Sequence, residues 1–184
     1  MAARAVGSRK QGNPARLTRH DQFHLGSLTK AMTATLLAIV LDDESNNLTW
    51  RTTLPEAFPD IANMSAEHAS TTLEMLAAHY SGVNDAILAA GVGLELGLAI
   101  RNQSLSPTAG RKAVTEVALT APPSLPAGST WQYSNIGYMM LGHLIDIHSA
   151  QYGGSWETAI RSRMWAPLGM TTCGFGTPPE RTLE

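Results

Sequence analysis

The sequence predicts an α+β fold that is mostly helical. Residues 27–41 carry apolar side chains at steps of three and four, which is the period of a buried helix face, namely at Leu28, Ala31, Met32, Leu36, Ile39 and Val40. Glycine and proline residues separate this segment from further helical segments, whereas only short N-terminal stretches suit a strand. The chain has 184 residues, of which 43% are hydrophobic, so it can bury a core, and its length fits one domain over residues 1–184.

The N-terminal part is expected to be extended. Residues 4–9 suit a short strand, residues 11–14 a turn with Gly and Pro, and residues 22–25 a brief extended piece. Ser27 then begins the first helix. No run of eighteen apolar residues exists, so this helix is predicted to lie in the core and not to span a membrane.

Later helices are predicted from their end signals. Thr71 and Glu74 fit a capping box for a helix over residues 73–79, which Gly82 can end in a left-handed conformation. The stretch 104–126 is rich in Pro and Ser and is expected to form loops around a short segment. Two more helices are expected at residues 136–149 and 155–165.

Composition excludes several classes of function. A net charge of −2 and scattered Lys and Arg residues give no basic field for nucleic acid or for an anionic membrane surface. Cys173 is the only cysteine, so no internal disulfide is expected, and a buried, inert thiol is the preferred interpretation. The first residues hold no secretory signal, so the chain is expected to be cytoplasmic as written, and secreted or periplasmic if a leader has been lost.

No metal or cofactor is expected. The six His residues include no H-E-x-x-H or similar ligand spacing, and no glycine-rich phosphate loop follows a strand.

The spacing of Ser27 and Lys30 indicates nucleophilic chemistry. Residues at i and i+3 share a helix face, so the Lys30 amine can reach the Ser27 hydroxyl. At a helix start, free N–H groups and the helix dipole favour a developing negative charge. Serine is a weak nucleophile that needs a base. Taken singly, however, Ser27 also fits an ordinary N-cap and Lys30 a solvated charge in the first turn.

Tyr133 and Asn135 form a second short pattern, Y-x-N. A phenol near a lysine ammonium can be shifted towards the pKa that a general base needs, so a Lys and Tyr pair around one Ser is chemically sensible. Taken alone, Tyr133 also fits a packed aromatic side chain with a satisfied hydroxyl.

Four segments in order resemble the serine β-lactamase and penicillin-binding-protein superfamily, specifically the class C β-lactamase and family VIII carboxylesterase branch. They are FHLGSLTKAMTA at 23–34, TLEMLAAHYSGV at 72–83, PAGSTWQYSNIGY at 126–138 and WAPLGM at 165–170. The resemblance implies a β-lactamase/transpeptidase-like fold, in which a helical half is paired with an antiparallel sheet. It implies acyl transfer to water through an acyl-enzyme, with carboxylic esters, β-lactams or D-amino-acid peptides as substrates.

Carried over to this sequence, the resemblance implies Ser27 as the acylated nucleophile. Lys30 and Tyr133 would handle protons, and the Asn135 amide would position substrate. His79 and Ser81 are interpreted as structural residues.

The sequence also departs from the family pattern. No K-T-G or H-x-G motif follows Asn135, and the Lys10-Gln11-Gly12 look-alike precedes the nucleophile. The chain therefore resembles the helical half with a reduced sheet, the C-terminal part of the sheet being absent. Three functions stay open: an active hydrolase, a truncated non-catalytic binding module, and a half that self-associates or is completed by another chain.

Overall fold

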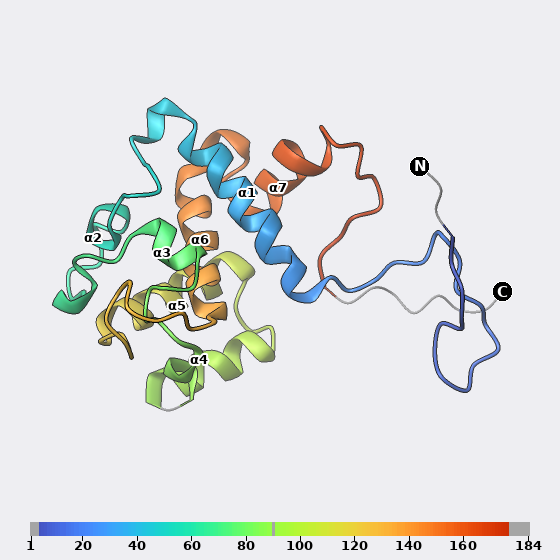
Figure 1. The fold of residues 1–184 in the computed structure, drawn as a ribbon, viewed down its shortest axis with the longest axis horizontal. Helices are drawn as coiled ribbons and strands as arrows, with labels where there is room; N and C mark the ends of the chain where they lie inside the picture. The colour runs from blue at the N-terminus through green and yellow to red at the C-terminus, as the bar shows by residue number, and fades with distance from the viewer. Residues whose placement is uncertain (1–3, 90, 177–184) are drawn as a thin grey trace.

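The protein is mostly helical, as the sequence predicts. A computed structural model describes residues 4–89 and 91–176 (Figure 1). The α-helices in this part of the chain are α1 (Thr29–Leu41), α2 (Leu54–Ala57), α3 (Leu73–Ala77), α4 (Gly91–Arg101), α5 (Pro107–Thr120), α6 (Asn135–His148) and α7 (Trp156–Ile160). Short 3-10 helices lie at Gly26–Leu28, Glu44–Asn46, Ala66–His68, Asp85–Leu88 and Ala150–Tyr152, and α7 continues as a π-helical segment, Arg161–Trp165.

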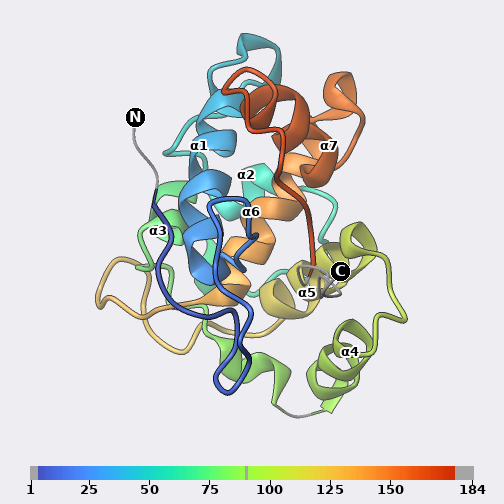
Figure 2. The ribbon, with the colours of Figure 1, turned by 90° about the vertical axis from the view of Figure 1, so that its right-hand side faces the viewer.

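Helix α6 lies at the centre of the molecule. It packs against α1, α3, α5 and α7, and both ribbon views show these helices around it (Figures 1 and 2). Apolar side chains recur along α6 at helical spacing and are fully or almost fully buried, among them Met140, Leu144 and Ile145. Helix α4 packs on α5 at the end of the molecule away from α7.

Helix α1 buries one face against α6 and leaves another face open. Leu36 and Val40 are completely buried, as the helical period predicts, and Leu37 is completely buried as well. The same period placed Leu28 and Ala31 among the buried positions, and that expectation was wrong, because both side chains are exposed. Leu28 lies in the 3-10 turn before α1 and Ala31 in the first turn of the helix, whereas the buried side chains lie further along α1, where it packs against α6 and α7.

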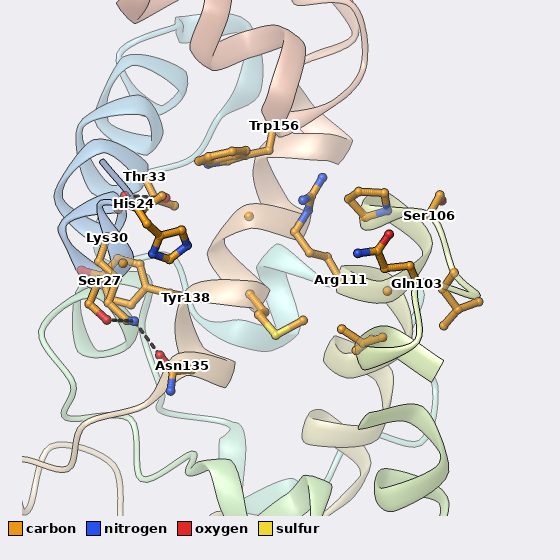
Figure 3. A pocket seen from close by; sticks show the side chains of 18 of the residues that line it. His24, Ser27, Lys30, Thr33, Gln103, Ser106, Arg111, Asn135, Tyr138 and Trp156 are labelled. Atoms are coloured by element: carbon orange, nitrogen blue, oxygen red, sulfur yellow. Dashed lines mark hydrogen bonds between the residues drawn. The ribbon is translucent and has the colours of Figure 1, made fainter. Parts of the chain in front are cut away.

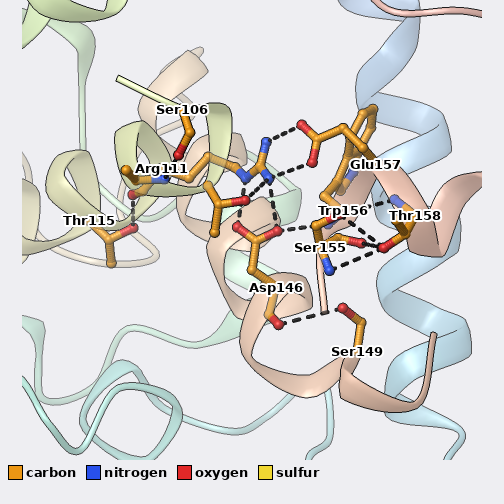
Figure 4. A network of polar contacts seen from close by, with 11 residues as sticks. Ser106, Arg111, Thr115, Asp146, Ser149, Ser155, Trp156, Glu157 and Thr158 are labelled. Atoms are coloured by element: carbon orange, nitrogen blue, oxygen red, sulfur yellow. Dashed lines mark hydrogen bonds and ion pairs between the residues drawn. The ribbon is translucent and has the colours of Figure 1, made fainter. Parts of the chain in front are cut away.

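A buried ion network ties α5, α6 and α7 together (Figure 4). The Arg111 guanidinium on α5 donates to both carboxylate oxygens of Asp146 on α6 at 2.8 Å. It also donates to the Glu157 carboxylate on α7 at 2.8 and 2.9 Å. Asp146 in turn accepts the Trp156 N–H, at 2.7 Å, at the start of α7. The Asp146 side chain is only 4% exposed, and a carboxylate this far from water is stable only when paired, so the network fixes how the three helices meet.

The expected sheet is reduced to two isolated antiparallel bridges within the described residues, Ser8 with Arg16 and Thr53 with Thr72. The predicted strand at residues 4–9 was therefore wrong. The Arg9 N–H donates to the Ala15 carbonyl at 2.9 Å and the Leu17 N–H to the Gly7 carbonyl at 3.0 Å, and within the described residues this pairing stays a single bridge. The segment turns back on itself at Gly12 and has no second strand to extend the pairing, so the turn was predicted correctly and the strand was not.

The stretch 104–126, predicted to be mostly loop, contains the 14-residue helix α5. Ser106 caps this helix by accepting the Ala109 N–H at 3.2 Å, and Pro107 occupies its first turn. Here Ser and Pro start a helix instead of breaking one. Helix α4 was not predicted.

The predicted capping box at Thr71 and Glu74 was wrong by one residue. Thr72 is the N-cap of α3, and its hydroxyl accepts the Met75 N–H at 3.3 Å. Thr71 is buried, and its hydroxyl has no hydrogen-bond partner among the described residues. The other two predicted helices are present, the first as α6 and the second as α7 with its π-helical continuation. The thiol of Cys173 is half-buried, not fully buried as expected.

None of the helices in residues 4–89 and 91–176 combines the length and the hydropathy that a membrane span requires.

Candidate active site

Ser27 lies in a 3-10 turn, Gly26–Leu28, that runs directly into α1. Its side chain is exposed and caps no backbone N–H of this turn. The plain N-cap interpretation of Ser27 therefore does not apply. The hydroxyl is free to face other side chains, and the positive end of the α1 dipole lies beside it.

Ser27, Lys30 and Tyr133 are in mutual contact. The Ser27 Oγ and the Tyr133 Oη form a 2.6 Å hydrogen bond, in which either oxygen can be the donor. The Lys30 Nζ donates to the Ser27 Oγ at 3.3 Å and lies 4.6 Å from the centre of the Tyr133 ring. The structure thus brings together the three residues that the resemblance assigns to nucleophile and proton transfer.

The surroundings of Tyr133 lower the pKa of its phenol. Side-chain hydrogen bonding with Lys30 is the largest effect that lowers the pKa of Tyr133, followed by the hydrogen bond with Ser27. Partial desolvation and the Asp85 carboxylate act in the opposite direction. A phenol with a lowered pKa beside a serine hydroxyl has the properties of a general base.

Asn135 is the first residue of α6 and also faces Lys30. Its Oδ1 accepts a hydrogen bond from the Lys30 Nζ at 2.7 Å, so Lys30 links the serine to the amide. The Asn135 Nδ2 points the other way and donates to Asp85 Oδ2 at 2.6 Å. Asp85 was not singled out in the sequence, because nothing local marks an aspartate 50 residues away as a partner of Asn135.

His79 holds the segment that carries Tyr133. Its Nδ1 accepts the Ser134 N–H at 3.1 Å, and its carbonyl accepts the Gln132 N–H at 2.8 Å. The ring also packs against Tyr133, with the ring centres 4.7 Å apart. His79 is therefore structural, as expected, and its structural role is to fix the position of Tyr133.

The backbone of His79 ends helix α3. Its φ of 64° is left-handed, the Tyr80 N–H donates to the Met75 carbonyl at 2.8 Å, and the His79 N–H donates to Leu76 at 3.2 Å. This is a Schellman ending, in which the left-handed position is usually a glycine. The ending predicted at Gly82 occurs three residues earlier, on a histidine.

A cavity of about 930 Å³ opens beside these residues (Figure 3). Ser27, Lys30 and Asn135 lie on one side of it, and Gln103, Ser106 and Arg111 lie across from them. The remaining lining includes several apolar side chains, namely Ile100, Leu105, Pro107, Met139 and Trp156. The cavity is large enough for a small organic molecule and is open to the Ser27 hydroxyl.

Among the residues that the structure describes, no three His, Cys, Asp or Glu side chains group as a metal site would require.

Comparison with known proteins identifies the family. The family model described as Beta-lactamase matches residues 1–183. The chain belongs to the β-lactamase family. The resemblance inferred from the four sequence segments is thereby confirmed at the level of the family.

Two curated relatives illustrate the range of this family. Penicillin-binding protein 4 from Amycolatopsis lactamdurans is 29% identical over 168 residues, which cover 90% of this chain and 39% of that protein. An unguisins hydrolase from Aspergillus campestris is 28% identical over 158 residues, covering 84% of this chain and 27% of the relative. The chain thus spans well under half the length of these relatives.

Solved structures support the same fold. A penicillin-binding protein homolog from Caulobacter crescentus superposes with a TM-score of 0.65 at 22% identity, covering 89% of this chain and 39% of that one. The D-amino acid amidase from Ochrobactrum anthropi SV3, complexed with L-phenylalanine amide, superposes with a TM-score of 0.62 at 23% identity. That match covers 90% of this chain and 41% of the amidase. The predicted β-lactamase/transpeptidase-like fold is confirmed.

Proposed function

We propose that this member of the β-lactamase family is a serine hydrolase that works through an acyl-enzyme. Its substrates are carboxylic esters, β-lactams or D-amino-acid peptides. The observation that carries the proposal is the 2.6 Å hydrogen bond between the Ser27 Oγ and the Tyr133 Oη, with the Lys30 Nζ at 3.3 Å from the same serine. A nucleophile in contact with a base, and a base in contact with a cation, is the arrangement that covalent catalysis requires.

The roles follow from the hydrogen bonds. Tyr133 accepts the Ser27 proton while the Ser27 Oγ bonds to the substrate carbonyl carbon. Lys30 acts as the cation that favours the phenolate form of Tyr133. When the tetrahedral intermediate collapses, the bond from carbon to the leaving oxygen or nitrogen breaks and the leaving group takes up the proton. Water, activated by the same pair, then attacks the ester carbonyl and releases Ser27.

Stabilisation of the oxyanion is the weaker part of the proposed mechanism. The Ser27 N–H, at the positive end of α1, is one donor that this chain supplies. Family members add a second donor from the strand that carries the third motif, and this sequence has no such motif after Asn135. Losing one oxyanion donor slows catalysis by about 10²- to 10³-fold. The chain is therefore expected to be acylated slowly.

The cavity supports an acyl group with an apolar side chain. Ile100, Leu105 and Trp156 add apolar surface to the cavity that Ser27 lines, while the Arg111 charge is balanced by Asp146 and Glu157. Arg111 is therefore not available to pair with a negatively charged group on a substrate. Esters and amides with apolar acyl groups are accordingly the first compounds to test.

Intact-mass spectrometry tests the proposal directly. Purified protein is incubated with p-nitrophenyl acetate or a fluorogenic β-lactam, in parallel with Ser27→Ala, and folding is checked by circular dichroism. A mass increase that maps to Ser27 and is absent in Ser27→Ala is expected. A folded chain that gains no mass, or gains the same mass in Ser27→Ala, would contradict the proposal and favour a non-catalytic binding module.

A second candidate function is a half-domain completed by another chain, or by a second copy of this one. The specific observation is a pair of exposed apolar side chains in the segment that leads into α1, with Phe23 at 66% and Leu28 at 68% exposure. Exposed large apolar side chains that gather on one surface are typical of an interface.

Analytical ultracentrifugation separates the two candidates. A monomer that labels at Ser27 with the same rate at every protein concentration would rule out completion by a second copy. Labelling that appears only in dimers, and is lost in Leu28→Asp, would support it. Ile147→Asp is the matched control, because Ile147 is 48% exposed and lies near the end of α6, whereas Lys30 contacts the first residue of that helix.

A further inference from the structure

Asp85 is the most heavily hydrogen-bonded carboxylate near the proposed site. It lies in the 3-10 helix Asp85–Leu88 and faces the start of α6. Its Oδ1 accepts the Asn135 N–H at 2.7 Å and the Ile136 N–H at 3.1 Å, and its Oδ2 accepts the Asn135 Nδ2 at 2.6 Å. The Ser134 Oγ lies 3.5 Å from Oδ1. One carboxylate thus serves both the backbone and the side chain of Asn135.

The Asp85 carboxylate also determines which way the Asn135 amide points. An ionised carboxylate only accepts hydrogen bonds, so it can face only the NH₂ end of the amide. The oxygen end must then point away from Asp85, and in this structure it accepts from the Lys30 Nζ at 2.7 Å. The Lys30 ammonium has only donors. It can therefore bond to the amide oxygen in this orientation, whereas the reverse orientation would place the amide NH₂ donors against it.

We propose that Asp85 is a positioning residue that fixes the orientation of the Asn135 amide and, through that amide, holds the Lys30 ammonium beside Ser27. The inference rests on the proposed hydrolase function for its kinetic consequences, although the orientation itself can be measured without activity. A reversed amide would present two N–H donors to Lys30, and the cation would move away from the Ser27 and Tyr133 hydroxyls.

A purely structural role for Asp85 is the alternative, since a carboxylate at the start of α6 also caps that helix. Asp85→Asn separates the two roles. The new side chain keeps an oxygen for the Asn135 and Ile136 N–H groups, but it places an NH₂ where Oδ2 accepted the Asn135 amide. The cap is retained, whereas the acceptor that orients Asn135 is lost.

The test uses acetylation of Ser27 by p-nitrophenyl acetate, which has no amide for Asn135 to bind. Asp85→Asn should slow labelling about 10- to 100-fold, the size of one lost charge-assisted hydrogen bond, while the thermal unfolding temperature stays near that of the wild type. In the double variant Asp85→Asn with Asn135→Asp, the carboxylate at position 135 can accept from the new amide NH₂ at position 85. Its other oxygen faces Lys30. The double variant should label faster than Asp85→Asn.

Asp43→Asn is the matched control. Asp43 also caps a 3-10 helix, accepting the Ser45 N–H at 3.1 Å, and it lies outside the proposed site. This variant should label like the wild type. Wild-type labelling in Asp85→Asn, or a double variant no faster than Asp85→Asn, would overturn the inference.

An NMR measurement keeps the inference testable if the wild type does not label. The Asn135 side-chain NH₂ gives one pair of ¹H–¹⁵N signals, identified by their loss in Asn135→Asp. The Asn135 side-chain N–H that donates to Asp85 should exchange its proton with solvent slowly in the wild type and rapidly in Asp85→Asn. Equal exchange in both proteins would overturn the positioning role, whereas slow exchange without labelling would contradict only the hydrolase function.

Discussion

The Ser27 Oγ and the Tyr133 Oη lie 2.6 Å apart, although 106 residues separate them in the chain. The local helical geometry around Ser27 does not account for this contact. The segment that carries Tyr133 is held by His79, which accepts the Ser134 N–H, and by Asp85, which accepts the Asn135 N–H. The proposed site therefore depends on two residues that lie between its two motifs in the sequence.

Removing the Tyr133 hydroxyl should abolish most acylation and leave the fold intact. Tyr133→Phe deletes the proton acceptor of Ser27, and a positioned general base typically contributes about 10²- to 10⁴-fold. The ring is 41% exposed, so little core packing changes. Stopped-flow release of p-nitrophenol measures the effect. Tyr80→Phe, at a residue 40% exposed in the neighbouring segment, is the control and should label normally. Equal rates for both variants would exclude Tyr133 as the base.

Acid should destabilise the protein through His79. Burial lowers the pKa of the His79 imidazole most, the Lys30 charge lowers it further, and Asp85 partly offsets both. The neutral ring is thus favoured in the folded state, where its Nδ1 accepts the Ser134 N–H. The contribution to the free energy of unfolding is complete above the ordinary pKa of His, about 6.5, and is lost as pH falls towards the lower folded-state value.

Urea unfolding at about pH 7.5 and pH 5 measures this contribution. His79→Asn is the informative variant, because Asn tolerates the left-handed backbone and does not titrate. The wild type should lose more stability between the two pH values than His79→Asn does. Burial also lowers the pKa of His143 and His148, so the wild type and His79→Asn should both lose some stability between the two pH values. An identical loss of stability in the two proteins would mean that His79 does not contribute to the acid destabilisation.

Local patterns in the sequence predicted part of this site well. Ser27 and Lys30 are three residues apart on one turn, so their proximity follows from helix geometry. Tyr133 and Asn135 could be assigned only through the family resemblance. Asp85 and His79 were missed as positioning residues, because hydrogen bonds across about 50 residues leave no periodic signal.

The two main errors in the predicted fold have different physical causes. The Pro and Ser content of residues 104–126 favours loops, whereas Ser106 caps helix α5 and Pro107 fits its first turn, where no N–H is needed. The strand predicted at residues 4–9 failed because a strand depends on a neighbour, and local sequence does not supply one.

Gly82, in the loop after α3, should not tolerate a side chain. A Cβ atom at Gly82 would lie 1.9 Å from the Leu125 carbonyl oxygen, and its φ is +74°. Gly82→Ala should cost about 1–2 kcal/mol for the backbone alone, and more because the Leu125 carbonyl must move. Gly154→Ala is the control, since its φ is +71° but nothing lies within 4 Å of the added atom. Urea unfolding should show a clearly larger loss for Gly82→Ala, and equal losses would mean that the 122–126 loop yields freely.

Breaking the ion network of Arg111, Asp146 and Glu157 should strongly destabilise the fold. Arg111→Met leaves the Asp146 carboxylate, which is 4% exposed, without its cation, and orphaned buried charges cost about 3–5 kcal/mol. The neighbouring Lys112 is the matched control on the same helix. Its ion pair with Glu116 is exposed, with 60% of the Lys112 side chain accessible, so Lys112→Met should change the free energy of unfolding by less than about 0.5 kcal/mol. Equal effects in urea unfolding would mean that Asp146 takes up a proton or water when Arg111 is lost, and that α5 is held on α6 by apolar packing alone.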